Sequence, residues 1–248
     1  SFREYLGLYG LIDMEALSLE ELLRDHVAIS MDIVSRCKII KAFNDYLTSG
    51  CYPFSLEAGE EYLLKLAAIA TLVIESDMPA VENVSYATVE KTKKLLAIIA
   101  QSVPLVPNVN KLGQALETTR DNCLRMLYTQ DKTKIISLLT KEEKSYKRIS
   151  SPEKIYLGNT NLMAALGVPV NVGNKRETFF NNQLQAVATV TLPPKGDFLV
   201  DGRYLFEVGG ASKTFEQIKD TPDSYLAVDD IEIGSGNRIP LWMFGLLY

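Results

Sequence analysis

The spacing of apolar residues predicts helices over the first third of the chain. Apolar side chains recur every three or four positions across residues 19–43, which is the period of an amphipathic helix. Ser18 with Glu21 three residues later has the form of a capping box and places the helix start, and Gly50 places its end. Residues 60–75 carry apolar side chains on most faces, which predicts a buried helix.

A different pattern occupies the middle of the chain. Residues 89–102 form an amphipathic helix with lysines on one side, and the prolines that follow end it. Two short helical patterns, 109–116 and 118–127, come next with a tight turn between them. An apolar pair at 135–136 and a lysine-rich stretch complete the order typical of a winged helix-turn-helix.

The last hundred residues mix short strands with helices. Helical patterns cover 161–166, 173–184 and 213–219, and strand patterns cover 154–157, 188–192, 197–200, 203–208 and 225–228. This alternation predicts an α/β domain with a mixed sheet. The expected protein is therefore multidomain, with a mainly α-helical region, a winged helix and an α/β domain at residues 1–84, 85–150 and 151–248.

Composition excludes several classes of site. The chain is 47% hydrophobic and 23% charged, as in soluble globular proteins. Cys37, Cys51 and Cys123 are odd in number and widely spaced, so we expect buried free thiols rather than disulfides or a thiolate zinc site. His26 is the only histidine, which excludes any site that needs two imidazoles, and its polar neighbours predict a solvent-exposed side chain.

The chain gives no sign of a membrane-spanning segment or of a signal peptide. No apolar run approaches the roughly 18 to 20 residues that cross a bilayer, and the first five residues have no secretory pattern. We therefore expect a cytoplasmic protein with no membrane partner.

Charge is distributed unevenly along the chain. Residues 1–84 carry 6 basic and 14 acidic side chains, residues 85–150 carry 12 and 6, and residues 151–248 carry 8 and 11. The basic middle region is typical of proteins that bind polyanions. Six of its cations are candidate contacts to nucleic-acid phosphates: Lys111, Arg120, Arg125, Lys132, Lys134 and Lys144. Glu117 and Asp121 lie in the same segment and would repel DNA, so a protein-packing module is the alternative.

Two acidic residues in consecutive strand patterns outline a further site. Asp197 lies in the stretch GDFLV and Glu207 in the stretch LFEVG, with Glu177 on an upstream helix and Gln217 downstream. This arrangement resembles the core of PD-(D/E)xK nucleases. The resemblance implies that Asp197 and Glu207 bind Mg²⁺ and that Glu177 and Gln217 orient the site.

A wider resemblance covers essentially the whole chain. The stretches SFREYL at the start, KIYLGNTNL at 154–162, RETFF at 176–180 and IPLW at 239–242 resemble the carboxy-terminal half of a family of prokaryotic AAA+ ATPases. In that family an ATPase domain is followed by a winged helix and a nuclease-like domain. The ATPase core would then be absent here, which agrees with the lack of a G-x-x-x-x-G-K-[ST] loop. The resemblance implies that ATP binds only to the missing domain, which would be a partner of this chain.

The acidic pair departs from the nuclease pattern at one position. Cleavage of a phosphodiester needs Mg²⁺ on one or two carboxylates and a cation near the attacking water. The motif would place a lysine at position 209, where this chain has glycine. Lys213 replaces it if its long side chain reaches back toward Glu207.

The turn between the two acidic strands decides whether the carboxylates can cooperate. A two-residue turn at Asp201-Gly202 pairs Val200 with Arg203 and puts Asp197 and Glu207 on opposite faces of the sheet. A three-residue loop with a bulge at Gly202 pairs Leu199 with Arg203 and puts both carboxylates on one face. We predict the bulged form.

Two functions follow from these patterns. The first is a DNA- or protein-binding arm of an AAA+ ATPase with a degenerate nuclease domain. The alternative is an active Mg²⁺-dependent nuclease that uses Asp197, Glu207 and Lys213.

Overall fold

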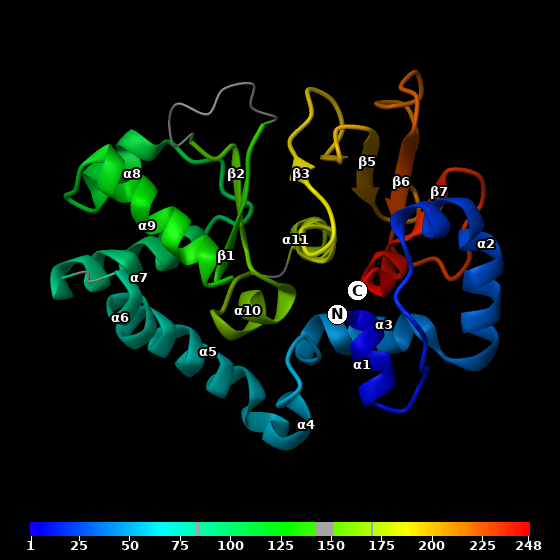
Figure 1. Ribbon diagram of the computed structural model, residues 1–248, viewed down its shortest axis with the longest axis horizontal. Helices are drawn as coiled ribbons and strands as arrows, with labels where there is room; N and C mark the ends of the chain where they lie inside the picture. Colours follow the sequence, from blue (N-terminus) through cyan, green and yellow to red (C-terminus); the bar gives the residue numbers. More distant parts are fainter. Residues whose placement is uncertain (83–84, 142–150, 170) are drawn as a thin grey trace. The chain divides into compact units, whose positions relative to one another are not determined.

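The protein folds into two compact units. A computed structural model describes residues 1–82, 85–141, 151–169 and 171–248. Unit 1 combines residues 1–56 with 171–248, and unit 2 holds residues 57–170 (Figure 1). Helices and a mixed sheet are present, as the sequence predicts, and the mixed sheet has five strands; a small two-stranded antiparallel sheet is also present. The limits of the units differ from the three expected ranges, because each unit is joined by contacts between segments distant in sequence.

Three helices from the start of the chain belong to unit 1. Ser18 and Glu21 form the expected capping box, with reciprocal bonds between side chain and backbone. The expected single helix is interrupted at Cys37, whose extended backbone separates two helices. The helices are α1 (Phe2–Leu8), α2 (Leu19–Arg36) and α3 (Ile39–Ser49).

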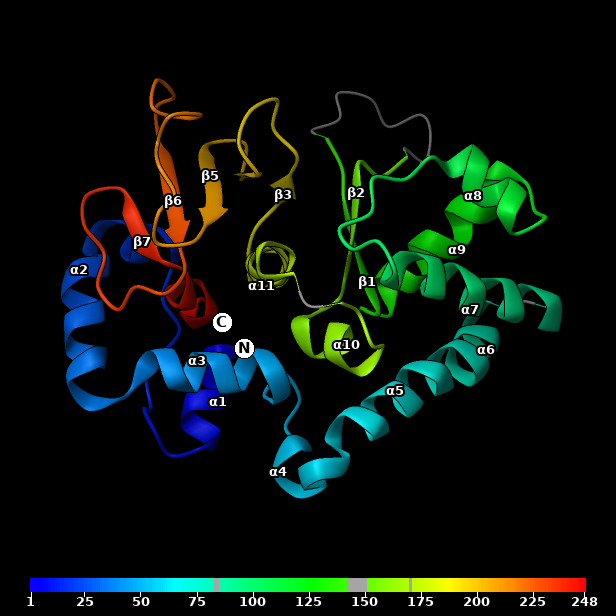
Figure 2. The same cartoon turned by 180° about the vertical axis from the view of Figure 1, so that it is seen from behind.

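An aromatic cluster attaches these helices to the α/β part of the chain. Phe2 and Phe43 lie with ring centroids 5.3 Å apart, and Phe43 meets Phe179 of α11 (Val172–Leu184) at 4.8 Å. The two ends of the chain lie side by side in Figure 2, and the Arg3 guanidinium donates to the Tyr248 carbonyl at 2.9 Å. Residues 1–56 therefore do not form an independent helical domain with residues 57–84.

The five-stranded sheet of unit 1 has the order β3-β4-β5-β6-β7. The first three strands pair antiparallel and the last three pair parallel, so the sheet is mixed. The strands are β3 (Val190–Thr191), β4 (Phe198–Val200), β5 (Tyr204–Gly209), β6 (Ser224–Val228) and β7 (Arg238–Pro240), and the 3-10 helix η3 (Leu241–Leu246) follows.

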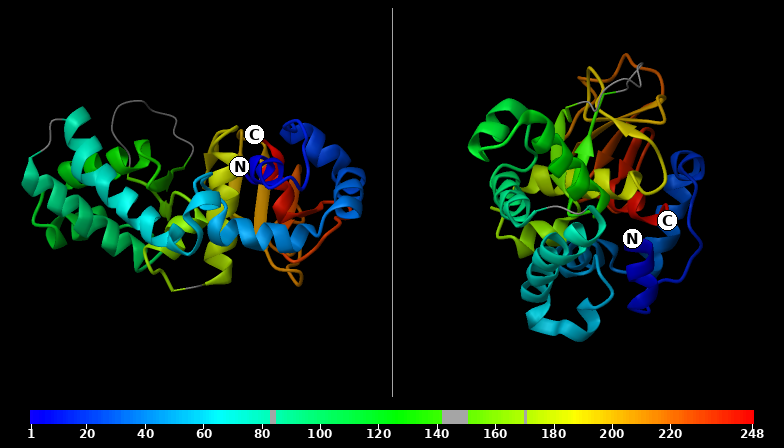
Figure 3. Two further views of the ribbon diagram at one scale, coloured as in Figure 1. Left: turned by 90° about the horizontal axis from the view of Figure 1, so that it is seen from below. Right: turned by 60° about the vertical axis from the view of Figure 1, so that its left-hand side comes forward.

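The two faces of this sheet have different cores. On one face, Phe180 of α11 packs against Phe198 and Phe206, with centroids 5.1 Å apart in both pairs. Figure 3 shows α11 running alongside the sheet. On the other face, Leu205 and Leu226 form a buried cluster with Ile218 and Val228. Because side chains alternate along β5, Glu207 points to the face of Leu205 and not to that of Phe206.

Unit 2 contains mainly helices and a small antiparallel sheet. Strand β2 (Lys154–Leu157) pairs with β1 (Ile136–Leu139), and Leu105 forms an additional bridge with Ile155. These pairings place residues 154–157 in unit 2, whereas the sequence assigned them to the α/β domain. The helices are α4 (Ser55–Ala58) at the junction, η1 (Gly59–Glu61), α5 (Tyr62–Leu72), the π-helix η2 (Val73–Asp77), α6 (Met78–Glu82), α7 (Tyr86–Ala100), α8 (Val109–Ala115), α9 (Arg120–Lys132) and α10 (Thr160–Ala165). Within the described ranges, none of the helices has the length and apolar character needed to cross a bilayer.

Candidate functional site

The turn between β4 and β5 combines features of both expected forms. Asp201 and Gly202 have positive φ angles, and the Arg203 amide donates to the Val200 carbonyl at 3.0 Å, so the turn is the tight two-residue kind. Val200 nevertheless pairs with Tyr204, which leaves Arg203 as an extra residue. The guanidinium of this extra residue bonds to Asp223. The predicted bulge at Gly202 is therefore wrong, since the extra residue is Arg203.

The observed register brings Asp197 and Glu207 to the same end of the β4–β5 pair. The ladder ends at the pair Phe198 with Phe206, so Asp197 immediately precedes it and Glu207 immediately follows it. The Asp197 amide donates to the Phe206 carbonyl at 3.0 Å, and Asp197 Oδ2 accepts from the Val208 amide at 2.8 Å. These two bonds lie on either side of Glu207 along β5. The β4–β5 register differs by two residues from the predicted one, since Leu199 pairs with Leu205 and not with Arg203. A register shift of two residues leaves each side chain on the same face of the sheet.

Lys213 occupies the space that the nuclease pattern would give to a lysine at position 209. Its Nζ lies 2.5 Å from Glu207 Oε1. A Cβ built on Gly209 would lie 2.7 Å from Lys213 Cγ and 2.8 Å from Cδ, so the lysine stem passes directly over the glycine. Glycine at 209 is thus what lets Lys213 reach Glu207.

Glu207 is buried, and only one of its two carboxylate oxygens has a partner among the described residues. Its side chain is 1% exposed, and that of Lys213 is 31% exposed. Oε1 has the lysine as its partner, whereas Oε2 is buried without a hydrogen-bond partner in the part of the chain that is described. A desolvated carboxylate oxygen with no partner is costly, so this atom marks a place where a cation would be stabilised.

Two arginines hold the loop that carries Lys213. They are Arg238, the first residue of β7, and Arg176 on α11. Arg238 of β7 donates to the carbonyls of Lys213 at 2.7 Å and of Ala211 at 2.8 Å. Arg176 of α11 bonds to Asp229 at 2.7 Å and lies over Gly210. No sequence pattern pointed to Arg176 or Arg238, because their partners are 25 or more residues away.

The same contacts explain why the helix expected at 213–219 does not form. The prediction is wrong, since this stretch consists of turns. The Lys213 carbonyl would have to accept from residue 217 in a helix, but it accepts from Arg238 instead. Ile218 and Lys219 close a single turn onto Phe215.

The two residues expected to orient the site occupy different places. Gln217 is exposed and lines a surface hollow together with Gly196, the neighbour of Asp197. Glu177 is half-buried on α11, the helix whose Phe180 packs on the opposite face of the sheet from Glu207. The structure therefore pairs Glu207 with Lys213 and binds Asp197 to the backbone of Val208, the residue after Glu207.

The donors of this site fit a single Mg²⁺ ion. Within the described ranges, no group of three or more His, Cys, Asp or Glu side chains could hold a metal. Mg²⁺ does not need such a group, because it commonly binds one or two carboxylates and takes its other ligands from water and substrate phosphates. The unpartnered Glu207 Oε2 supplies an anionic oxygen for this purpose.

The expected phosphate contacts of unit 2 lie on its surface. Lys111, Arg125 and Lys134 are exposed, and within the described residues they have no acidic partner. Arg120 bonds to Ser151 at 2.8 Å and lies 3.6 Å from Asp121. Lys132 is exposed at the end of α9. Lys144 lies outside the described residues.

The lysines of α7 have structural partners. Lys91 and Lys94 donate to the carbonyls of Glu117 and Ala115, which lie at the end of α8. Lys93 forms ion pairs with Glu75 and Glu90 at 2.8 and 2.7 Å. These contacts stabilise the packing of α7.

His26 and two of the cysteines differ from expectation. His26 is 3% exposed, and its Nε2 lies 2.9 Å from the Gly236 carbonyl. The signal was present in the spacing, because His26 continues the buried stripe of α2. Burial lowers the pKa of this imidazole. All the cysteines are free, and Cys123 is buried, but Cys37 and Cys51 are half-buried.

Comparison of the chain with protein-family models, with curated proteins and with solved structures found no match. Function is therefore inferred from the geometry of these residues.

Proposed function

We propose that unit 1 hydrolyses phosphodiester bonds of nucleic acid with the help of one divalent cation. The observation that carries this proposal is Glu207, a buried carboxylate with Lys213 on one oxygen and no partner on the other. It favours the active-site hypothesis over a degenerate nuclease domain that serves only as a binding arm.

A purely structural ion pair does not account for this arrangement. Removing a carboxylate from water costs several kcal/mol, and the cost is offset only when both of its oxygens are satisfied. Two features would have avoided the cost: an apolar residue at 207, or a second donor for Oε2. The exposed part of Lys213 leaves the ion pair open to solvent on one side, where a substrate phosphate can approach.

Each residue has a distinct role in the proposed reaction. Asp197 and Glu207 hold the cation, and the bond from the Val208 amide fixes the Asp197 carboxylate. The bound cation supplies Lewis-acid stabilisation of the phosphate charge. Lys213 places a positive charge next to Glu207, where it orients the attacking water and stabilises charge that develops in the transition state. The water oxygen bonds to phosphorus as the bond to the leaving sugar oxygen breaks. The attacking water gives up a proton to solvent, and the leaving oxygen takes one up from solvent.

Unit 2 supports a second role, the binding of the nucleic-acid backbone. The specific observation is that Lys111, Arg125 and Lys134 are exposed without acidic partners within the described residues, whereas the α7 lysines are used internally. Helices α8 and α9 followed by the β1–β2 pair have the element order of a winged helix. Action beside an AAA+ ATPase domain, in the cytoplasm, is a further proposal that the sequence resemblance alone supports.

Cleavage by the full chain tests the proposed reaction. Labelled single-stranded and duplex DNA are incubated with the protein and Mg²⁺ or Mn²⁺, and products are resolved on denaturing gels. We expect the cation-dependent cleavage to fall by at least about a hundredfold in Asp197→Asn and in Glu207→Gln. Asp201→Asn is the matched control, because this carboxylate lies in the neighbouring turn and bonds to the Thr189 amide.

Calorimetric titration with Mg²⁺ and Mn²⁺ separates the two hypotheses. The active-site hypothesis requires binding heat that disappears in Asp197→Asn. Absence of both heat and cleavage in the folded wild-type chain would leave the degenerate binding arm as the surviving hypothesis.

A further inference from the structure

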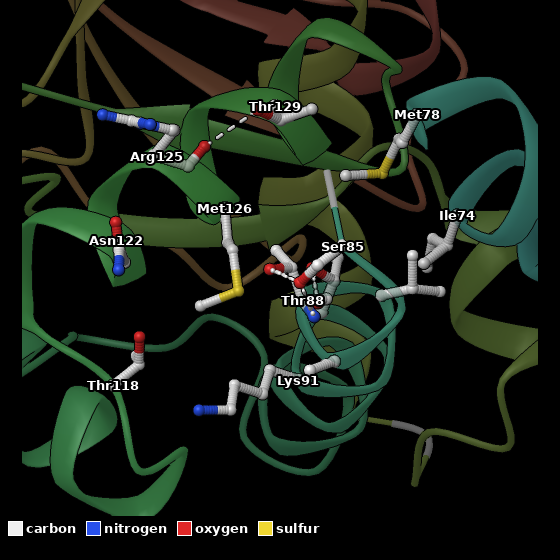
Figure 4. A pocket seen from close by; sticks show the side chains of 13 residues that line it. Ile74, Met78, Ser85, Thr88, Lys91, Thr118, Asn122, Arg125, Met126 and Thr129 are labelled. Atoms are coloured by element: carbon white, nitrogen blue, oxygen red, sulfur yellow. Dashed lines mark hydrogen bonds between the residues drawn. The ribbon is translucent and has the colours of Figure 1, made fainter. Parts of the chain in front are cut away.

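Unit 2 contains a cavity whose lining includes Arg125, one of the exposed cations proposed to bind nucleic acid. It has a volume of about 440 Å³ and lies between the π-helix η2, the beginning of α7 and one face of α9 (Figure 4). This size is within the range of sites for small organic molecules. All of its walls come from unit 2, since the lining residues lie between Ile74 and Thr129.

The lining mixes apolar and polar side chains. In Figure 4, Met126 lies between Asn122 and Thr118 on one side and Ser85, Thr88 and Ile74 on the other. Methionine side chains adapt to flat or irregular apolar ligands because the thioether is flexible and polarisable. Apolar walls with a few polar groups are typical of pockets that fix the orientation of a small molecule.

The charge of the lining favours an anion. Lys91 and Arg125 are the charged residues among the described residues that form the walls, and both are basic. Lys91 donates to the Glu117 carbonyl, so its charge is not neutralised by an acid. The Arg125 guanidinium lies at the rim and has no acidic partner within the described part of unit 2. An uncompensated guanidinium next to a pocket favours a carboxylate, sulfonate or phosphate group.

The π-helix that forms one wall is an independent sign of a binding site. Residues Val73–Asp77 depart from the α-helical ladder between α5 and α6. Such departures weaken the hydrogen-bond ladder and occur frequently at functional sites. Here the π-turn supplies Ile74, and α6 supplies Met78 immediately after it.

We propose that this cavity binds a small organic anion with an apolar body, whose charged group lies near Arg125 and Lys91. The apolar body packs against Met126, Met78 and Ile74, and the Asn122 amide bonds to a polar atom of the ligand. This site is independent of the phosphodiesterase proposed for unit 1.

Binding of 8-anilinonaphthalene-1-sulfonate to the full chain tests the proposal, because this probe joins a sulfonate to an apolar body. Its fluorescence rises on transfer into an apolar site, so a titration yields the dissociation constant. We expect Arg125→Gln to weaken binding about tenfold through loss of a charge-assisted contact. Ala87→Trp should weaken it at least tenfold, because Ala87 is exposed on α7 and lines the cavity, which an indole would fill.

Two matched variants control for effects elsewhere. Tyr86→Trp adds an indole one residue away at a side chain that is 79% exposed and does not line the cavity. Lys111→Gln removes a cation from α8 outside the cavity. Both should bind the probe as the wild type does, and circular dichroism checks that every variant is folded. Equal binding by wild type and folded Ala87→Trp, or by wild type and Arg125→Gln, would overturn the proposal and place the probe on another apolar surface.

Discussion

The two units use charge in opposite ways. Beside several exposed ion pairs, unit 1 has two that are largely buried: Arg176 and Asp229 are 17% and 14% exposed, and Glu207 is almost fully buried beneath Lys213. In unit 2 Lys111, Arg125 and Lys134 are exposed and have no acidic partner among the described residues. A charge that is desolvated and paired fixes a geometry, whereas an exposed unpaired charge is available to a partner that arrives from solution.

The difference has an energetic consequence. The buried pairs of unit 1 are only weakly screened by salt, and removal of one member leaves an uncompensated charge. The exposed charges of unit 2 contribute little to folding, and salt screens them over a distance of about 8 Å at physiological ionic strength. Substitutions in unit 1 should therefore alter chemistry and stability, and substitutions in unit 2 should alter only the strength of polyanion binding.

The largest effect is expected from moving the lysine of unit 1. Lys213→Met should reduce cation-dependent cleavage by about a hundredfold to a thousandfold, because the charge beside Glu207 is removed. The double variant Gly209→Lys with Lys213→Gly returns the lysine to the motif position and vacates the space above it. We expect this variant to recover most of the activity, measured as the initial rate of DNA cleavage.

Gly209→Ala alone tests whether Lys213 needs the space above residue 209 to reach Glu207. Its Cβ would lie under 3 Å from the Lys213 stem, so the ammonium must move away from Glu207 and the cleavage rate should fall. Wild-type activity in Gly209→Ala, or full activity of Lys213→Met, would contradict the role of Lys213.

The second prediction concerns the exposed cations of unit 2. Neutralising Lys111, Arg125 and Lys134 together should lower DNA affinity by about a hundredfold at 0.15 M salt. The slope of log affinity against log salt should fall by about 0.9 for each phosphate of duplex DNA that the variant no longer neutralises. Lys93→Gln is the matched control, since Lys93 is already paired with Glu75 and Glu90. Fluorescence anisotropy at several salt concentrations measures both quantities, and an unchanged slope in the triple variant would exclude these residues from binding.

Local patterns predicted most of the elements but not their assembly. The capping box at Ser18, the strand at 154–157 and the helix at 173–184 follow from short-range rules, and all form at or near the expected positions. The packing of Phe43 on Phe179 could not be predicted, because it joins segments more than 130 residues apart. Unit limits depend on such contacts, so the expected boundaries at 84 and 150 differ from those of the structure.

The candidate site was predictable in its residue types and less so in its geometry. Because side chains alternate between the two faces of the sheet, placing both carboxylates on one face requires an extra residue in the hairpin. The structure has one, at Arg203 instead of Gly202. The choice depends on the ion pair of Arg203 with Asp223, which no turn rule contains. The path of Lys213 over Gly209 depends likewise on Arg238, a residue of a strand that the sequence pattern did not reveal.

The third prediction tests whether the loop contacts of unit 1 are as specific as its buried pairs. Arg238→Gln removes the donors to the Ala211 and Lys213 carbonyls and should lower the free energy of unfolding by about 1.5 kcal/mol. The cleavage rate at saturating DNA should fall while the Michaelis constant changes little, because Lys213 acts on the chemical step. Arg36→Gln is the control, as its ion pair with Asp32 on α2 is exposed. Equal losses in both variants would mean that Arg238 has no special role in placing Lys213.

The smallest expected effect is a pH dependence of unit 1 that unit 2 lacks. His26 is buried, its Nε2–H donates to the Gly236 carbonyl, and its Nδ1 has no partner within the described residues. Burial lowers its pKa in the folded state, and the opposing effect of Asp25 is smaller. As pH falls below the unfolded value near 6.5, the unfolded chain takes up a proton that the folded chain resists, so stability decreases by at most about 1.4 kcal/mol per pH unit. Urea unfolding of unit 1 between pH 7.5 and 5.5 should show this decrease, and His26→Gln, which keeps a donor for Gly236, should reduce it. An identical pH dependence in His26→Gln would assign the effect to carboxylates and remove His26 from the comparison.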